Sequence, residues 1–298
     1  MEIEIEKPDK QTLVQNLDPT EYRHTARDFL SYFRINAHTS RSLQIIAEIL
    51  KAFIHIPYEN LSKIIKYHNY HHDTASLRLP DEVWQDFRNY RLGGTCFSLT
   101  FFLRAIVDAL GFTSYPVMAH MQAGRNRHCA LIVDFRGKHY LLDPGYVLDV
   151  PLLIDNEQRK LYRSAHAGVE LRAGDLPLHY NLYTFTQEKI QWRYSFADIP
   201  VSDADFLRRW LDSFSWNGMN GVCLTQARKD SLIFIHKYFM RETKIDGKQN
   251  YNLKRNREQV IQEIFGIPSQ FVEAAEAALQ ERMAKYCNSG CVLPQNKK

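Results

Sequence analysis

The spacing of apolar residues changes twice along the 298 residues of this chain. As far as Gly111, apolar residues recur at three- and four-residue intervals, as at Leu43, Ile46 and Leu50, which is typical of helices that bury one face. Asp18-Pro19 adds a helix start, because it joins a capping residue to proline at the first helical position. The pattern predicts helices over 19–33, 40–54, 80–90 and 96–110.

After Gly111 the period changes and short runs typical of strands follow, of which 190–196 alternates, with Ile190, Trp192, Tyr194 and Phe196 on one face. The predicted strands are 114–122, 129–135, 138–143, 183–186 and 190–196. Short strands separated by turns favour an antiparallel sheet or a small barrel. Helical spacing returns at Ser202, and a strand, a hairpin through Asp246-Gly247 and two more helices follow. We therefore expect an α+β fold in three units, 1–110, 111–200 and 201–298.

The segment from Arg91 through Gly93-Gly94 to Cys96 leads into the most apolar of the predicted helices. The two glycines permit a backbone bend that a side chain would block, and Thr95 is a suitable cap for a helix that starts at Cys96. Cys96 should then lie at the positive end of a buried helix, where the pKa of a thiol is lowered and the thiolate is available at neutral pH. The alternative for a cysteine in an apolar run is a plain core residue.

His128 and Asp143 lie at the outer ends of two predicted strands that are joined at Arg136-Gly137. A two-residue turn there places Ala130 opposite Asp143. His128 and Asp143 then share one face of the sheet as diagonal neighbours, ~7–8 Å apart at the backbone and within side-chain reach. Taken singly, each has an ordinary interpretation, His128 as a surface loop residue and Asp143 as a turn starter.

Together, Cys96, His128 and Asp143 supply what thiol-based acyl chemistry requires. The cysteine is the nucleophile, the imidazole accepts its proton, and the carboxylate fixes the imidazole tautomer. A Cys96 thiolate beside a His128 imidazolium would be a preformed ion pair. Such a pair attacks a thioester or an activated carbonyl without a separate deprotonation.

Composition excludes several classes of protein. A net charge of +4 is small for this length and argues against a dedicated nucleic-acid binder, although it leaves room for a local basic pocket. No apolar run is long enough to span a membrane, and the acidic start from Met1 to Glu6 is not a signal peptide, so we expect a cytoplasmic protein with no membrane partner. Five cysteines spread thinly fit reduced thiols better than a disulfide framework.

Two segments carry residue types that bind metals, and we assign a metal site to neither. Residues 66–73 are predicted to be a polar loop with three histidines and Asp73, but they lack helical i, i+4 spacing and paired cysteines. Cys287 and Cys291 lie in a loop-like segment without a second pair of ligands, and we interpret them as incidental thiols.

The chain resembles the arylamine N-acetyltransferases over most of its length. That family shares an Ile-Pro-(Phe/Tyr)-Glu-Asn-Leu segment, here at 56–61, and an Arg-Gly-Gly-x-Cys segment, which ends here at Cys96. It also shares a histidine that opens a strand and an Asp-x-Gly-(Phe/Tyr) motif fifteen residues later, here at His128 and at 143–146. The resemblance implies a divergent, prokaryotic-type member with a helical bundle, an antiparallel β-barrel and an α/β lid around a papain-like Cys-His-Asp core.

The resemblance also implies a ping-pong reaction. Acetyl-coenzyme A would acylate Cys96, and an aromatic amine, hydrazine or N-hydroxyarylamine would take the acyl group, with His128 as proton relay, Asp143 as its orienting group and the Cys96 backbone N–H as oxyanion donor. In the family the segment before the histidine approaches the coenzyme, so Arg125 and Arg127 are candidates for its phosphates, unless they are solvated loop residues. The implied partners are two small molecules, with no metal and no nucleic acid, and we expect a monomer or homodimer.

The chain departs from the family at two positions beside the nucleophile. Leu92 stands where the family has arginine, and Ser98 stands where it has an acidic residue. We expect the polar support of the first helical turn to differ, with Glu59 paired to Arg91 or to another partner. These departures leave acyl transfer as our hypothesis but make the arylamine acceptor uncertain. An amide synthase acting on a larger substrate, a transglutaminase-like cysteine hydrolase and a catalytically silent scaffold remain the alternatives.

Overall fold

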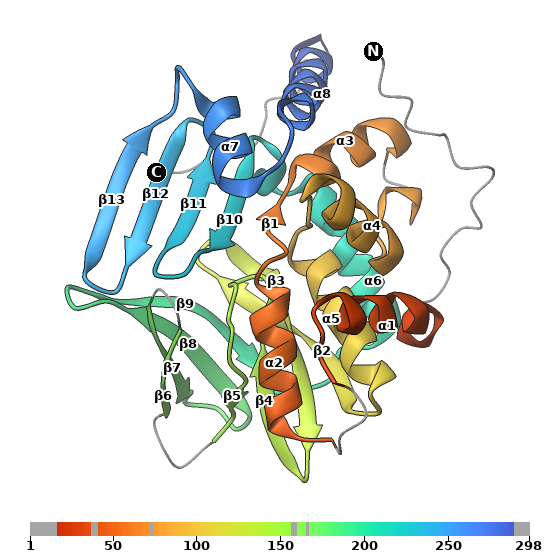
Figure 1. Cartoon of the computed structure of the whole chain (residues 1–298), viewed down its shortest axis with the longest axis vertical. Helices are drawn as coiled ribbons and strands as arrows, with labels where there is room; N and C mark the ends of the chain where they lie inside the picture. The colour runs from red at the N-terminus through yellow and green to blue at the C-terminus, as the bar shows by residue number, and fades with distance from the viewer. Residues whose placement is uncertain (1–16, 37–40, 72–73, 156–159, 165–166, 289–298) are drawn as a thin grey trace.

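The computed structural model describes residues 17–36, 41–71, 74–155, 160–164 and 167–288. Its first part is helical, as the spacing of apolar residues predicts, and these helices gather on one side of the molecule (Figure 1). A short 3₁₀ turn at Pro19–Tyr22 precedes them. The helices are α1 (Arg23–Tyr32), α2 (Leu43–Phe53), α3 (Leu61–Tyr70), α4 (Pro80–Tyr90) and α5 (Cys96–Ala109).

An antiparallel sheet of eight strands follows, in the spatial order β5-β4-β3-β2-β9-β8-β7-β6. Its edge strands β5 and β6 lie next to each other, so the sheet curls into a nearly closed barrel. The strands are β2 (Thr113–Met121), β3 (Gly124–Phe135), β4 (Lys138–Leu142), β5 (Leu152–Leu153), β6 (Lys160–Arg163), β7 (Gly168–Ala173), β8 (His179–Phe185) and β9 (Ile190–Ala197). The predicted small barrel is confirmed.

The last part of the chain forms a second antiparallel sheet, flanked by helices. One edge strand of this sheet, β1 (Tyr58–Glu59), comes from the N-terminal part of the chain and pairs with β10. The strand order is β1-β10-β11-β12-β13. The remaining elements are α6 (Asp203–Asp212), β10 (Cys223–Ala227), β11 (Leu232–His236), β12 (Phe239–Lys244), β13 (Gly247–Asn252), α7 (Arg257–Phe265) and α8 (Ser269–Asn288). The predicted α+β fold is confirmed, and Figure 1 shows the smaller sheet lying beside the barrel.

The central helix of the molecule is α5. It packs against α1 and α4 and against strands β2 and β3. Every residue from Cys96 to Leu103 is buried. Phe97 and Phe101 also contact Trp210 on α6, so α5 joins the helical core to the last part of the chain. Gly111 follows the helix with φ of 77°, as expected of a glycine that ends it.

One local prediction is wrong, and a second is correct for the position of the residue but not for its hydrogen bond. Residues 66–70 are the end of helix α3 instead of a loop, while 72–73 lie outside the described residues. The Lys66 ammonium reaches the Leu77 carbonyl at 2.7 Å and pairs with Glu82, so tertiary contacts stabilise a helix whose sequence is polar. Thr95 precedes α5 with extended backbone, yet its hydroxyl makes no capping hydrogen bond and is buried without a partner among the described residues.

Candidate active site

The three candidate residues meet at the N-terminal end of α5. Cys96 is the first residue of that helix, His128 lies in β3, and Asp143 directly follows β4. Strands β3 and β4 pair in the predicted register, with Leu131 opposite Leu142. His128 Nε2 lies 2.8 Å from Asp143 Oδ2, and the thiol of Cys96 lies within hydrogen-bond reach of the same imidazole. All three side chains are buried.

Asp143 is completely buried, yet both its oxygens are hydrogen-bonded. Besides His128, Oδ2 accepts from the Tyr194 hydroxyl at 2.5 Å, and Oδ1 accepts from the Tyr146 backbone N–H at 3.0 Å. A buried carboxylate without such donors costs several kcal/mol, roughly, so the partners are part of the site. Together they fix the direction in which the carboxylate faces the imidazole. Nothing in the sequence indicates that Tyr194 donates to Asp143, since its pattern is that of an ordinary inward-facing strand residue.

His128 is held in its charged form. Burial by itself would lower the pKa of this imidazole, but the charge and hydrogen bond of Asp143, with a smaller effect of Cys96, raise the pKa to about 10. The rings of Tyr146 and Tyr194 pack against the imidazole, with centroids 5.1 and 4.9 Å away. His128 is therefore a fixed imidazolium at neutral pH.

Cys96 is held as the matching anion. Its pKa lies well below the usual value, first because the Cys129 thiol is within hydrogen-bond reach, and also because of the hydrogen bond and charge of His128 and the charge of Lys63, all of which outweigh burial. Burial raises the pKa of Cys129 itself well above its usual value, so Cys129 keeps its proton, and its Sγ donates to the Thr100 hydroxyl at 3.6 Å. The predicted thiolate–imidazolium pair thus has a second thiol beside it, which the sequence analysis missed.

Gly145 lies where no side chain fits. A Cβ atom at this position would stand 2.7 Å from His128 Cε1 and 3.1 Å from the Cβ of Cys96. The glycine of the Asp-x-Gly motif is therefore required by close approach. It leaves the space in which the imidazole and the sulfur face each other.

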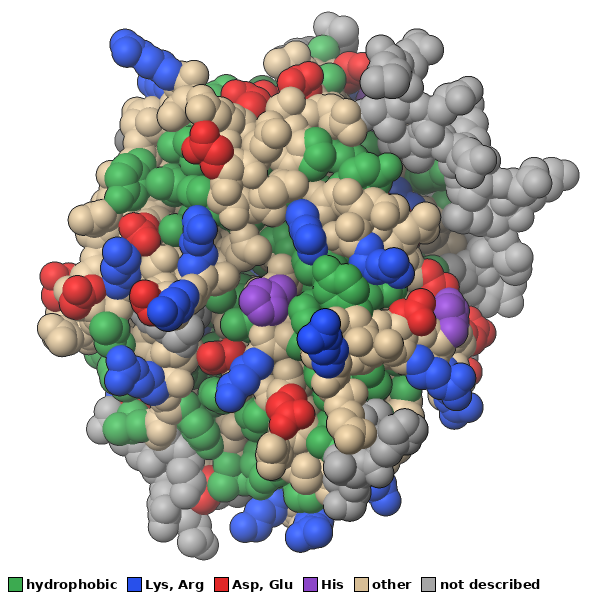
Figure 2. Space-filling view, in the orientation of Figure 1, with side chains coloured by type: hydrophobic (Ala, Val, Ile, Leu, Met, Phe, Trp, Pro, Cys, Tyr) green, Lys and Arg blue, Asp and Glu red, His purple; other side chains and the backbone are tan. Residues whose placement is uncertain are grey.

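A cavity of about 340 Å³ opens at Cys96 and His128. Residues of both sheets line it. Figure 2 shows several Lys and Arg side chains on the face of the molecule where the two sheets adjoin. Arg127 lines the cavity, with its guanidinium 4.8 Å from the centroid of the Trp216 ring. Arg125 is exposed and is not among the lining residues. Only one of the two candidate arginines therefore faces the site.

The loop before Cys96 lies directly on the segment that forms β1. The Gly94 carbonyl accepts from the Glu59 N–H at 3.0 Å, and the Gly94 N–H donates to the Pro57 carbonyl at 3.4 Å. A Cβ atom at Gly93 would stand 1.9 Å from the Pro57 oxygen. Gly93 is thus needed because two backbone segments pack without a side chain between them, and Gly94 because a Cβ there would stand 2.9 Å from the Cβ of Ser98.

Glu59 and Asn60 bind different parts of the chain. Glu59 is fully buried and accepts from the Gly93 N–H at 3.2 Å, from the Ser62 N–H at 3.0 Å and from the Ser62 hydroxyl. Asn60 donates to the Gly221 carbonyl at 2.8 Å and accepts from the Cys223 N–H at 2.8 Å. This short motif therefore holds both the nucleophile loop and the start of β10.

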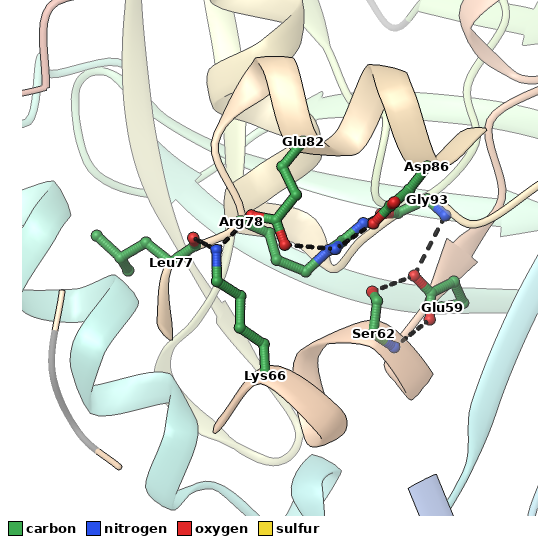
Figure 3. Close-up of polar contacts among 8 residues, drawn as sticks. All are labelled: Glu59, Ser62, Lys66, Leu77, Arg78, Glu82, Asp86 and Gly93. Carbon is green, nitrogen blue, oxygen red and sulfur yellow. Dashed lines mark hydrogen bonds and ion pairs between the residues drawn. The ribbon is translucent and has the colours of Figure 1, made fainter. Parts of the chain in front are cut away.

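The positive charge beside this loop comes from Arg78. Its side chain is 3% exposed and binds Glu82 at 2.9 Å and Asp86 at 2.7 Å, while Nη2 donates to the Gly93 carbonyl at 3.1 Å (Figure 3). The peptide of Gly93 is thus held at its N–H by Glu59 and at its C=O by Arg78. The sequence held one signal for this contact: Glu82 and Asp86 follow Arg78 by four and eight residues, so both carboxylates lie on one face of a helix and could pair with it.

Arg91 does not replace the missing arginine. Its guanidinium donates to the Tyr32 hydroxyl at 3.4 Å and lies over the Phe87 ring, 5.3 Å from the centroid. A pairing between Glu59 and Arg91, one of the two expected alternatives, is therefore wrong. The other alternative, a different partner for Glu59, is the one observed.

Replacing Arg78 by methionine should destabilise the protein and displace the nucleophile loop. The change leaves Glu82 and Asp86 without their buried cation and the Gly93 carbonyl without a donor, at a cost of roughly 3 kcal/mol in the free energy of unfolding. Chemical denaturation measures this change. Arg88→Met, at an exposed arginine on the helix α4 that follows Arg78, should change the free energy by less than about 0.5 kcal/mol. Equal effects of the two substitutions would contradict the role of Arg78.

Two further observations concern metals and membranes. Within the described part of the chain, no three side chains of the His, Cys, Asp or Glu type are grouped so that they could hold a metal ion. In the same residues, none of the helices combines the length and apolar character that a membrane span requires.

Comparisons with known proteins point to one family. The sequence profile of a family described as N-acetyltransferase matches residues 42–273. An arylamine N-acetyltransferase from Nocardia farcinica is similar in structure, with a TM-score of 0.71 at 18% identity over 88% of this chain and 99% of that chain. The enzyme from Salmonella typhimurium has a TM-score of 0.69 at 15% identity, over 85% of this chain and 98% of that chain. The enzyme from Mycobacterium abscessus has a TM-score of 0.68 at 17% identity, over 86% of this chain and 94% of that chain. No curated protein sequence matches the chain.

Proposed function

This chain belongs to the N-acetyltransferase family and is an acyltransferase, and from this we propose that Cys96, His128 and Asp143 transfer an acetyl or other short acyl group from coenzyme A to an arylamine, hydrazine or N-hydroxyarylamine. The observation that carries the proposal is the charged Cys96–His128 pair, which lies beside the buried Asp143 and lines a cavity. The fold of three arylamine N-acetyltransferases supports the choice of acceptor.

In the first half-reaction the Cys96 thiolate attacks the carbonyl carbon of the acyl thioester. The bond between that carbon and the coenzyme sulfur breaks, and the departing thiolate takes the proton of the His128 imidazolium. The backbone N–H of Cys96, at the start of α5, is the proposed donor to the oxyanion. The product of this step is an acyl-Cys96 thioester beside a neutral imidazole.

In the second half-reaction the amine attacks the acyl-Cys96 carbonyl. Neutral His128 accepts a proton from the amine nitrogen, the carbon–sulfur bond breaks, and Cys96 leaves as a thiolate. Asp143 keeps the imidazole in one orientation and stabilises its charged form. The free amide departs, and the thiolate–imidazolium pair is restored without a net change in protons.

The experiment that tests this proposal is trapping of the acyl-enzyme. Acetyl-coenzyme A alone should add the mass of one acetyl group to the protein, as measured by intact-protein mass spectrometry. An aromatic amine should then remove that mass and yield its acetylated product. Indifference to acetyl-coenzyme A together with hydrolysis of peptide amides would instead support the cysteine hydrolase.

The charged pair also predicts a flat pH profile. The pKa of Cys96 lies well below its usual value and that of His128 is about 10, so both groups keep their charges between these two limits. As the pH falls through the lowered thiol pKa, the thiolate gains a proton and alkylation by iodoacetamide slows. As the pH rises through about 10, His128 loses the proton that the coenzyme sulfur needs, and acylation slows. A single increase in alkylation rate near the usual thiol pKa would contradict the pair.

A further inference from the structure

One wall of the active-site cavity is positively charged. Among the residues that the structure describes, the cavity is lined there by four basic residues and by no acidic residue. We call these four residues, Lys189, Arg193, Arg241 and Lys248, the cationic wall. They come from the turn between β8 and β9, from β9, from β12 and from β13, so both sheets contribute. In Figure 2, several Lys and Arg side chains lie over the ends of β12 and β13 next to that turn, with Asp and Glu side chains among them.

The strand pairing brings the cations of the smaller sheet together. Lys248 lies opposite Thr243, two residues after Arg241, so Arg241 and Lys248 project from the same face of the β12–β13 hairpin. Arg241 is anchored because its Nε donates to Asn250 Oδ1 at 3.0 Å. Arg193 is anchored in the same way, because its Nε donates to the Thr184 hydroxyl at 2.6 Å. In both arginines, the hydrogen bond of Nε fixes the orientation of the guanidinium group.

The cationic wall faces a cavity without acidic side chains. None of the described residues that line the cavity is Asp or Glu. Burial, followed by the charges of Arg193, Arg241 and Lys189, lowers the pKa of Lys248, and nearby Glu188 only partly opposes them. The cations repel one another in the free protein. An anion that enters the cavity would relieve this repulsion and accept their hydrogen bonds.

The wall begins close to the proposed reacting centre. Arg193 lines the same cavity as Cys96 and His128. It directly precedes Tyr194, whose ring centroid lies 4.9 Å from that of His128. In coenzyme A the pantetheine arm separates the thioester from the phosphates. A group that reaches Arg193 while the reacting carbonyl lies at Cys96 therefore belongs to the acyl group or to the acceptor.

We propose that the cationic wall binds a carboxylate or similar anionic group carried by the reacting part of the substrate, either on the acyl group or on the acceptor amine. This inference rests on the proposed acyl transfer at Cys96 and narrows its substrate class. A planar carboxylate matches the fork of the Arg193 guanidinium, and Arg241 and Lys248 add charge.

Matched substrate pairs test the proposal and identify the source of the anion. The acceptor arm compares 4-aminobenzoate with 4-aminobenzamide, using acetyl-coenzyme A as donor. The acyl arm compares malonyl- with propionyl-coenzyme A in single-turnover acylation. The coenzyme arm compares acetyl-coenzyme A with S-acetylpantetheine, which lacks the nucleotide phosphates. Each arm gives the ratio of kcat/KM, or of acylation rate, for the two members of its pair.

The wild-type protein should prefer the anionic member in the acceptor arm or the acyl arm. Arg193→Gln should lower that ratio roughly tenfold, and exposed Lys248→Gln should lower it less. Lys244→Gln, an exposed lysine on β12 that does not line the cavity, is the matched control and should leave the ratio as it is. Calorimetric binding of 4-aminobenzoate and 4-aminobenzamide to the Cys96→Ser protein repeats the comparison without turnover. It therefore separates failure of this inference from failure of the proposed function.

Two outcomes would overturn the inference. The first is the absence of any preference for the anionic member in the acceptor and acyl arms, or a preference that survives Arg193→Gln. The second is an effect of the substitutions confined to the coenzyme arm, since that would assign the wall to the nucleotide phosphates.

Discussion

Cys96→Ser is expected to abolish the acyl-enzyme and to lower turnover by ~10⁴-fold or more. Two physical reasons combine. A serine hydroxyl is far less acidic than a thiol, and His128, whose pKa Asp143 raises, already carries a proton at neutral pH and cannot accept another. Intact-protein mass spectrometry after incubation with acetyl-coenzyme A measures the first effect, and amine acetylation measures the second.

The matched control is Cys223→Ser in the same cavity. Cys223 also lines the cavity, but burial raises the pKa of its thiol to about 12, so it is protonated and a poor nucleophile. The Cys223→Ser protein should still gain one acetyl group from the donor. If acylation survived in Cys96→Ser and disappeared in Cys223→Ser, the nucleophile would be Cys223, and the assignment of Cys96 would be wrong.

His128→Gln is expected to reduce turnover by ~10³- to 10⁵-fold, the second largest effect. Glutamine can still donate a hydrogen bond to Asp143, but it carries no positive charge. The pKa of Cys96 should then rise, and the departing coenzyme sulfur has no proton donor. The rate of Cys96 alkylation as a function of pH reports the first change, and single-turnover acylation reports the second.

The barrel offers a closely matched control for this substitution. His139 Nδ1 lies 2.6 Å from Asp198 Oδ2, and the Tyr115 hydroxyl donates to Asp198 at 2.7 Å, so a second His–Asp–Tyr group exists outside the cavity. His139→Gln removes the same kind of contact and should leave the thiol pKa and acyl transfer unaffected. If both histidine variants lost activity equally, the loss at His128 would reflect damage to the barrel.

Much of the fold was readable from local patterns. The apolar spacing that predicts 96–110 corresponds to α5, and the short apolar runs before and after Arg136-Gly137 correspond to β3 and β4. The two-residue turn between those strands determines their register, and hence the meeting of His128 with Asp143. Such features depend on neighbours within a few residues, so propensity and periodicity suffice to predict them.

Other parts of the site were beyond prediction because they depend on long-range packing. Cys129 and Tyr194 look like ordinary inward-facing strand residues, and Arg78 precedes a helix with no hint that it reaches Gly93. In a regular strand Arg125 and Arg127, two residues apart, would project from the same face and both would reach the cavity. They differ because Asn126 between them takes a φ of 54°, next to an irregularity in the β2–β3 pairing.

The sequence by itself determined the change from helices to strands and back to helices, the place of Cys96 at the start of a buried helix, and the pairing that joins His128 to Asp143. Each of these follows from residues close together in the chain or from a short turn. Only the tertiary structure decided which arginine supports the nucleophile loop, that a second thiol lies beside Cys96, and that lysines and arginines of two sheets converge on one cavity. Those contacts arise where the curled sheet, the smaller sheet and α5 pack together, and the energy that selects that packing is shared among many distant residues.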